Sequence, residues 1–288
     1  MPATIPAMPT STLLDSATFA GAHALAIYGA LLLLVTLSAG LVARALLPTQ
    51  GGGTPAPVPI SLLALCLRFA AGFGCIVGGA WLFTEIAEAL HTEHTLGRWD
   101  EAFILAMIDH IPDAAIHAFY LVTFLGNRET LITLGVVVFI GLLLRGRRGL
   151  ALGWALGMLG NAVLNPTLKH VFERARPLHP TEWLTEGGFS FPSGHSSGIV
   201  VTMGLLAYLA VRLLPRAWHV PAWMLAAGLA FTVGASRIFL RVHFPSDVIA
   251  GFATGGAWLT VSLVSISLAR WARRRRRGAQ ASTVELTR

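Results

Sequence analysis

Seven long apolar runs constrain the fold of this chain more than any other feature. A helix that crosses a bilayer needs roughly 17 to 25 predominantly apolar residues, and 55% of the 288 residues are hydrophobic while only 12% are charged. This balance differs from that of a soluble domain, so we predict an integral membrane protein of the all-α class, a polytopic helix bundle. The expected spans are residues 22–43, 60–83, 131–144, 150–168, 198–213, 220–235 and 248–268.

A Gly/Pro-rich stretch divides the chain into unequal parts. Residues 48–59, PTQGGGTPAPVP, follow the first apolar run and are typical of a flexible connector. We therefore expect residues 1–59 to hold a tail, one extra transmembrane helix and a linker, residues 60–270 to form a six-helix membrane core, and residues 271–288 to form a basic cytoplasmic tail. No Lys or Arg precedes the first apolar run, so we expect that run to be retained rather than cleaved as a secretory signal.

One apolar segment, residues 101–125, is interrupted by polar residues. It carries Asp109, His110, Pro112 and Asp113 in its middle, and spanning the bilayer would bury these charges without partners. We predict a broken helix that lies at the membrane interface.

The positive charges lie at the ends of the apolar runs. The formal net charge is +7, but this placement is explained by orientation in a bilayer and gives no reason to expect nucleic acid as a partner. Placing the C-terminus in the cytoplasm puts most of the 21 Lys and Arg residues on the inner side. That inner group is Arg44, Arg145, Arg147, Arg148, Arg212, Arg216, Arg270, the arginine run at 273–277, and Arg288.

Small residues within the apolar runs are expected to serve packing. Cys66 and Cys75 have no metal-ligand spacing, and we expect both to be small core residues. Three glycine pairs have the spacing that lets helices approach closely: Gly74/Gly78, Gly153/Gly157 and Gly251/Gly255.

Three loops on the predicted outer face carry polar residues that topology does not explain. The first is KHVFERARP, residues 169–177, which holds Lys169, the only lysine of the chain, and Arg176 seven positions later. A single lysine in a chain that otherwise uses arginine indicates a compact point charge at this helix end. The alternative is a pair of interface cations whose aliphatic stems lie in the membrane.

The second loop is FPSGHSSG, residues 191–198, directly before an apolar run. Pro192 and Ser193 can begin and cap a helix, which leaves backbone N–H groups near Gly194, His195 and Ser196 free to bind an anion. Gly194 allows a ligand to approach closely, and His195 can hold or donate a proton near neutral pH. An ordinary capped helix start would use the same residues.

The third loop is SRIFLRVHFPSD, residues 236–247. A helix that begins near Pro245 would bring the Asp247 carboxylate back toward His243, four positions earlier. A carboxylate in that place fixes the tautomer of the ring and stabilises the imidazolium, as in triad enzymes. The other ring nitrogen is then free to act as a nucleophile.

Together the three loops supply Lys169, Arg176, Arg237, one helix N-terminus and two histidines on one face. Guanidinium groups match phosphate oxygens in pairs, and each charge-assisted hydrogen bond contributes on the order of 1.5 to 3 kcal/mol. This combination indicates a site for a tetrahedral oxyanion.

These residues resemble the signature of the type 2 phosphatidic acid phosphatase family, membrane lipid phosphate phosphatases of the acid phosphatase/vanadium haloperoxidase superfamily. The family signature reads K-x6-R-P, P-S-G-H and S-R-x5-H-x3-D, and every signature position is matched between Lys169 and Asp247. The resemblance makes residues 60–270 a phosphatase-type membrane core and leaves the N-terminal helix outside the usual six-span pattern.

The family mechanism, carried over to matching positions, implies three catalytic residues. His243 attacks phosphorus to form a phosphohistidine, and Asp247 orients His243. His195 protonates the leaving oxygen and then activates water. No cofactor and no metal ion are implied, and the sequence has no clustered carboxylates of the kind that a magnesium or two-metal site needs.

A second group of signature residues is implied to hold the phosphoryl oxygens and the charge that develops in the transition state. These residues are Lys169, Arg176, Ser193, Gly194 and Arg237. Four further polar residues lie in the same loops at positions that the signature does not fix, and we expect them to pack at the membrane interface or behind the site: His170, Glu173, Arg174 and Arg241.

The resemblance implies a lipid phosphate or lipid pyrophosphate in the membrane as the substrate, with undecaprenyl pyrophosphate, phosphatidylglycerol phosphate and phosphatidic acid as candidates. The expected location is a bacterial inner membrane, with the site facing the periplasm or exterior. A phosphotransferase that passes the phosphoryl group to another lipid fits the same residues, because exclusion of water decides between the two. A transporter is disfavoured, since the charges gather at one end of the predicted bundle and no internal repeat is visible.

Overall fold

The structure, a computed structural model, describes residues 10–46, 62–93, 95–182, 184 and 186–286; for residues 10, 62–69, 92–93 and 273–286 it describes the backbone alone. This described part contains helices and no strands, as predicted. In chain order the helices are α1 (Thr10–Ala22), α2 (Ala24–Leu46), α3 (Leu62–Glu88), a π-helical turn (Ala89–Glu93), α4 (Thr95–Met107), α5 (Asp113–Thr123), a 3-10 turn (Phe124–Gly126), α6 (Arg128–Leu144), α7 (Arg148–Phe172), α8 (Gly194–Leu213), a second 3-10 turn (Arg216–Trp218), α9 (His219–Phe239) and α10 (Pro245–Leu286).

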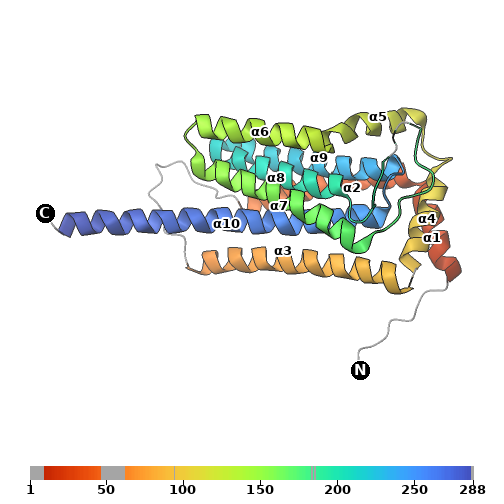
Figure 1. Cartoon of the computed structure of the whole chain (residues 1–288), viewed down its shortest axis with the longest axis horizontal. Helices are drawn as coiled ribbons and strands as arrows, with labels where there is room; N and C mark the ends of the chain where they lie inside the picture. The colour runs from red at the N-terminus through yellow and green to blue at the C-terminus, as the bar shows by residue number, and fades with distance from the viewer. Residues whose placement is uncertain (1–9, 47–61, 94, 183, 185, 287–288) are drawn as a thin grey trace, which may run out of the picture.

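Each predicted apolar run corresponds to one long helix. Among the described residues, α2, α3, α8, α9 and α10 are long and apolar enough to cross a membrane, and α5 with α6 adds a sixth span if this bent pair is counted as one. The remaining run forms α7, which lies alongside the others in the bundle (Figure 1). α7 carries Asn161, Asn165 and Pro166 among its apolar residues and is not among these spans. Seven spans were expected, and five or six segments of the described part of the chain have the length and composition of a span.

The N-terminal helices pack closely on the rest of the molecule. In α2, the hydroxyl of Tyr28 lies 3.0 Å from that of Thr232 in α9, and its ring packs against Phe119 of α5. α1 lies against α4, where Trp99 Nε1 donates a 3.1 Å hydrogen bond to Ser16. The added segment is thus part of the packed structure.

Of the two boundaries of the predicted three-part division, only the one near residue 270 falls within the described residues. The connector at residues 48–59 lies outside the described residues. The predicted tail continues α10 as a helix as far as Leu286. The division into three parts stays a prediction.

Residues 101–125 form a broken helix, as predicted. α4 ends at Met107 and α5 begins at Asp113, with Pro112 as its N-cap residue in an extended conformation. α5 then meets α6 at an angle of 44°. Figure 1 shows α1 and α4 lying across one end of the bundle, approximately perpendicular to the long helices. This arrangement gives that end of the bundle a cover of short helices.

Two glycines bring α10 directly against the start of α8. A Cβ atom on Gly251 would lie 2.6 Å from the backbone oxygen of Ser193, and one on Gly255 would lie 2.8 Å from the Cα atom of Ser197. Any larger residue at these positions would push the two helices apart. The close approach joins the second and third predicted loops.

The other packing expectations are fulfilled only in part. Gly153 and Gly157 face side chains of α10 and α8 at close range, as expected. The prediction for Gly74 and Gly78 was wrong, because a Cβ atom on either would meet nothing within 4 Å. Cys75 is exposed rather than in the core, and the other cysteine lies among the residues whose side chains are not described.

Candidate active site

Four helix ends meet near α4: the last turns of α7 and α9 and the first turns of α8 and α10 (Figure 1). The loop from α7 to α8 runs between them and is held by a 2.8 Å hydrogen bond from the Ser190 N–H to the Arg174 carbonyl. The three predicted loops are therefore neighbours in space, although they are distributed from residue 169 to residue 247 of the sequence.

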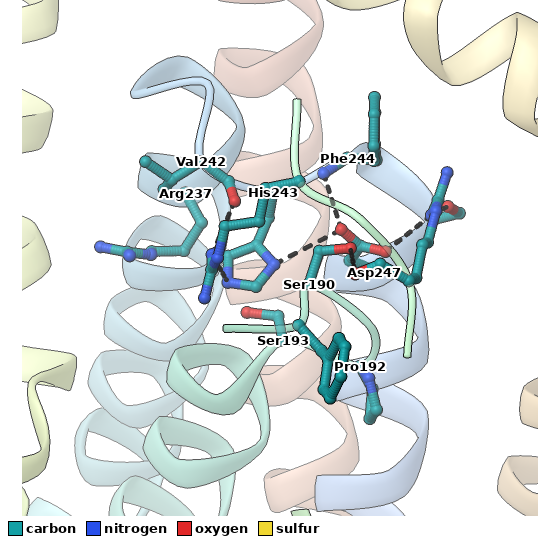
Figure 2. Close-up of polar contacts among 12 residues, drawn as sticks. Ser190, Pro192, Ser193, Arg237, Val242, His243, Phe244 and Asp247 are labelled. Carbon is teal, nitrogen blue, oxygen red and sulfur yellow. Dashed lines mark hydrogen bonds and ion pairs between the residues drawn. The ribbon is translucent and has the colours of Figure 1, made fainter. Parts of the chain in front are cut away.

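His243 and Asp247 make the contact that their spacing predicts. α10 begins at Pro245, so Asp247 in its first turn faces back toward the ring (Figure 2). Nδ1 of His243 lies 3.4 Å from Oδ2 of Asp247, and the same oxygen accepts a 2.9 Å hydrogen bond from the backbone N–H of Phe244. Both side chains are buried. The pair is thus fixed by the turn that starts α10.

Arg176 determines which nitrogen of His243 carries the proton. Its Nη1 lies 3.1 Å from Nε2 of His243 and donates a 2.8 Å hydrogen bond to the Val242 carbonyl. A guanidinium only donates, so Nε2 accepts and is unprotonated. The ring proton of neutral His243 is then on Nδ1, facing Asp247. The lone pair of Nε2 points toward the arginine.

The charge state of His243 follows from its surroundings. Burial lowers the pKa of His243 well below its ordinary value of 6.5, and Arg176, Arg237 and Lys169 lower it further, while Glu186 acts in the opposite direction. At neutral pH the ring is uncharged, which is the form that can attack an electrophile.

Ser193 caps α8, as predicted. Its Oγ accepts hydrogen bonds from the N–H of Ser196, at 3.4 Å, and from the Ser196 hydroxyl, at 3.0 Å. The N–H of Ser196 was predicted to be free for an anion and is instead used by this cap. The N–H of Ser193 donates a 3.0 Å hydrogen bond to the carbonyl of Asp247. Gly194 begins the helix, and a Cβ atom there would lie 3.0 Å from Oδ1 of Asn165. The start of α8 is thus packed between α7 and α10.

His195 is held by a residue that the sequence pattern did not single out. Its Nε2 lies 2.9 Å from Oδ1 of Asn127, the N-cap residue of α6. An isolated Asn before a helix gives no sign of such a role, because 68 positions separate the two residues. The contact orients the imidazole and leaves Nδ1 as its other polar atom.

Arg237 lies in the interior, with 0% of its side chain exposed. Its Nη1 donates a 2.6 Å hydrogen bond to Oγ1 of Thr123, and its Nη2 forms an ion pair with Glu186. A buried guanidinium needs such partners, since an unpaired charge in the interior is strongly unfavourable.

Glu186 is the second residue that the sequence analysis missed. Its carboxylate contacts both Arg237 and Arg176, the latter at 3.2 Å. Burial alone would raise the pKa of Glu186, but Arg237, His195, His243 and Arg176 together lower it to about 2. The carboxylate is therefore ionised and lies where the positive groups of the site converge. We call this point, where the Glu186 carboxylate meets Arg176 and Arg237, the anion seat.

Lys169 contributes a further positive charge at the same place. Its Nζ donates a hydrogen bond to the carbonyl of Phe189. Its electrostatic neighbours include Arg176, Glu186 and Arg237. The ammonium group thus borders the anion seat from the end of α7.

Of the four polar residues at non-signature positions, Arg174 contacts Asp247 directly. It forms ion pairs with Asp247, at 2.6 Å, and with Asp100 of α4, at 2.8 Å. Glu173 ends α7 in a left-handed conformation with φ 46°, His170 packs edge-on against Phe189, and Arg241 lies in the turn before α10 with φ 56°. Asp100 was not predicted, because nothing in its local sequence marks it.

The carboxylates of the site all face arginines. Asp100 and Asp247 contact Arg174, and Glu186 contacts Arg176 and Arg237. Throughout the described ranges, no three His, Cys, Asp or Glu side chains are grouped so that they could hold a metal ion. The arrangement instead combines a neutral histidine with several fixed cations, which suits nucleophilic attack on an oxyanion.

Comparison with protein families agrees with the resemblance seen in the sequence. The model of the PAP2 superfamily matches residues 149–271, which include all three loops. The chain is also similar to a solved structure of a transmembrane PAP2 type phosphatidylglycerolphosphate phosphatase from Bacillus subtilis, with 30% sequence identity and a TM-score of 0.61. That match covers 66% of this chain and 94% of the solved chain.

Curated relatives are phosphatases by name. The chain is 31% identical over 175 residues to phosphatidylglycerophosphatase B of Bacillus subtilis, which covers 60% of this chain and 85% of the relative. It is 33% identical over 111 residues to an undecaprenyl-diphosphatase of Sulfolobus acidocaldarius, covering 36% of this chain and 48% of the relative. A lipid A 1-phosphatase of Rhizobium johnstonii is 37% identical over 122 residues, covering 40% and 44%.

Proposed function

We propose that this chain, which belongs to the PAP2 superfamily, is a membrane phosphatase. It hydrolyses a lipid phosphate or lipid pyrophosphate through a phosphohistidine on His243. One observation carries the proposal. A buried, neutral histidine, with its Nδ1 on the Asp247 carboxylate, presents Nε2 toward a group of fixed cations at one end of an apolar helix bundle. A phosphate headgroup can enter there while its hydrocarbon chain remains in the lipid.

In the first step, Nε2 of His243 attacks phosphorus. An N–P bond forms, and the bond between phosphorus and the leaving oxygen breaks. His195 gives a proton to that oxygen, so the lipid leaves as an alcohol or as a shorter phosphate. Asp247 stabilises the positive charge that forms on the His243 ring and keeps its orientation. Arg176 must turn its Nη1 from Nε2 to a phosphoryl oxygen as the substrate binds.

In the second step, water replaces the histidine. His195, now neutral, takes a proton from the water as the oxygen attacks phosphorus, the N–P bond breaks, and inorganic phosphate leaves. The same group thus acts as acid and then as base. Its contact with Asn127 keeps the ring in place through both steps.

Fixed positive groups hold the phosphoryl oxygens. In a water-poor site, preorganised donors stabilise charge that develops in the transition state and need no reorganisation. Ser193 and Gly194 contribute the N-terminus of α8, where the helix dipole favours an anion. The cations assigned to this role are Lys169, Arg176 and Arg237. Glu186 pairs with Arg176 and Arg237, so the substrate must displace its carboxylate.

The names of the relatives support the substrate class. They act, by name, on phosphatidylglycerophosphate, undecaprenyl diphosphate and lipid A. For this chain we propose phosphatidylglycerol phosphate, undecaprenyl pyrophosphate and phosphatidic acid as the lipids to test. We further propose a bacterial inner membrane location with the C-terminus in the cytoplasm and the site outside, because the arginines of the α6–α7 and α8–α9 connections lie at the opposite end of the bundle from the site.

The test is phosphate release from these three lipids by the detergent-purified protein in excess EDTA. We expect release that survives EDTA, since the proposed mechanism uses no metal, and we expect His243→Ala to abolish it. A matched control is His110→Ala, which alters an exposed histidine. Loss of release in EDTA would overturn the metal-free mechanism. Transfer of the labelled phosphoryl group to an added acceptor lipid, in place of phosphate release, would mark a phosphotransferase.

A further inference from the structure

Asp100 is a buried acidic residue outside the three signature loops. It lies on α4, and its side chain is 0% exposed. Its Oδ1 accepts a 3.3 Å hydrogen bond from the backbone N–H of Ser246, 146 positions along the chain, and its Oδ2 accepts from the Ser246 hydroxyl. A buried carboxylate on a helix at the end of the bundle is thus joined to the first turn of α10.

Arg174 connects this carboxylate to Asp247. Its Nη2 donates a 2.8 Å hydrogen bond to Asp100, and its Nη1 donates to Asp247, at 2.6 Å, and to the Ser246 hydroxyl, at 2.7 Å. The face of the guanidinium lies 4.3 Å from the ring of Phe244. The planar group is therefore held on both ends and on one face.

This arrangement divides the two oxygens of Asp247 between different partners. Oδ1 faces Arg174, while Oδ2 faces the Phe244 N–H and Nδ1 of His243. If Arg174 were free to move, Asp247 could turn with it and withdraw Oδ2 from the histidine. The Asp100 carboxylate, on the far side of the guanidinium, prevents that movement and shares the positive charge of Arg174.

We infer that Asp100 is a positioning residue of the active site: by anchoring Arg174 it fixes Asp247, and through Asp247 it fixes the orientation of His243. This inference rests on the proposed function and extends it to a residue outside the matched family region, 149–271. Asp100 itself does not touch the substrate.

The same contacts connect the N-terminal helices to the active site. α4 is held by α1, where the Trp99 side chain donates to Ser16 and a Cβ atom on Gly21 would lie 2.4 Å from the carbonyl oxygen of Phe103. Because Asp100 lies between Trp99 and Phe103 on α4, the packing of α1 against α4 determines the position of the Asp100 carboxylate. The segment beyond the six-helix core thus braces the catalytic pair.

The first variant to test is Asp100→Asn, which removes the charge at nearly constant volume. We expect kcat to fall by about 10- to 100-fold, the range for partners that orient a reacting group, with KM within about twofold of wild type. A purely structural role would lower the thermal unfolding midpoint and leave kcat unchanged. The matched control is Asp109→Asn, an exposed carboxylate in the turn that follows the same helix, for which we expect wild-type kinetics.

If Asp100→Asn does not fold, a second variant tests the positioning role. Arg174→Lys keeps the positive charge but cannot bridge two carboxylates, so it should lower kcat to a similar extent with KM unchanged. If both single variants fold, the double variant should be no slower than the slower of the two, because they act through one contact chain. Wild-type kcat in the folded single variants, a change confined to KM, or additive losses would overturn the inference.

Single-turnover experiments with labelled phosphatidylglycerol phosphate, or with whichever of the three lipids wild type cleaves fastest, separate this inference from the proposed function. If wild type forms no phosphoenzyme during turnover, the proposed function is wrong. If wild type forms one and Asp100→Asn forms it at the same rate, only the positioning role is wrong. The inference expects formation to be slower in Asp100→Asn.

Discussion

Nε2 of His243 lies 3.1 Å from Nη1 of Arg176. Since the arginine can only donate, this contact places the histidine proton on Nδ1, the nitrogen that faces Asp247. The nucleophilic lone pair is thus directed at the residue that is proposed to bind the phosphoryl group. The contact thus gives His243 the tautomer that the proposed chemistry needs.

The first prediction concerns Asp247. An amide in place of the carboxylate removes the charge that stabilises the His243 imidazolium, so Asp247→Asn should lower kcat on the order of 10,000-fold, as for the orienting carboxylate of triad enzymes. Steady-state kinetics and thermal unfolding in detergent check this. Asp109→Asn, at an exposed turn position, serves as the control. A kcat within about tenfold of wild type would show that Asp247 does not orient the nucleophile.

The second prediction concerns Lys169. Its ammonium donates to the Phe189 carbonyl and borders the cations of the anion seat. A guanidinium is longer and planar, so Lys169→Arg should lower kcat/KM at least about tenfold, which corresponds to ~1.4 kcal/mol. Arg98→Lys, the reverse exchange at an exposed position, should have little effect. Unchanged kinetics of Lys169→Arg would reduce Lys169 to an anchor at the membrane interface.

The third prediction concerns competition at the anion seat. Glu186 forms ion pairs with Arg176 and Arg237, so a substrate phosphate must displace its carboxylate. Glu186→Gln should therefore bind orthovanadate, a tetrahedral oxyanion, about tenfold more tightly, a gain of ~1.4 kcal/mol. Inhibition of phosphate release measures this, with the exposed Glu182→Gln in the same loop as control. Weaker inhibition of Glu186→Gln would mean that Glu186 helps to bind the anion.

The fourth prediction follows from the pKa of Glu186, which is about 2 in the folded protein against an ordinary value of 4.5. A lowered acid pKa means that folding favours the ionised form, so its stabilising contribution is complete above pH 4.5 and is lost as the pH falls toward 2. The unfolding midpoint of wild type should exceed that of Glu186→Gln near neutral pH, and the difference should shrink on acidification. A difference that is constant with pH would contradict this electrostatic account.

Local patterns in the sequence predicted the parts of the site that helix geometry determines. The four-residue spacing of His243 and Asp247, with Pro245 between them, leads directly to their contact, and Ser193 caps α8 as its position indicates. The same reasoning identified the apolar helices, because long apolar runs in a membrane protein form few structures other than helices.

Local sequence patterns could not predict the contacts between distant segments. Glu186, Asn127 and Asp100 carry no motif, and each reaches the site only because tertiary packing brings separate helix ends together. The prediction for Gly74 and Gly78 failed for a related reason: small-residue spacing shows that a helix can be approached, not that another helix lies on that face.

The central claim is that His243 becomes phosphorylated during turnover. The most direct measurement is rapid quenching of the purified protein with a substrate labelled at the transferred phosphate, in EDTA, followed by localisation of the label within the chain. The account predicts an acid-labile, base-stable label on the peptide that contains His243, and none in His243→Ala. Turnover of wild type without such a label, or a label that persists in His243→Ala, would contradict it.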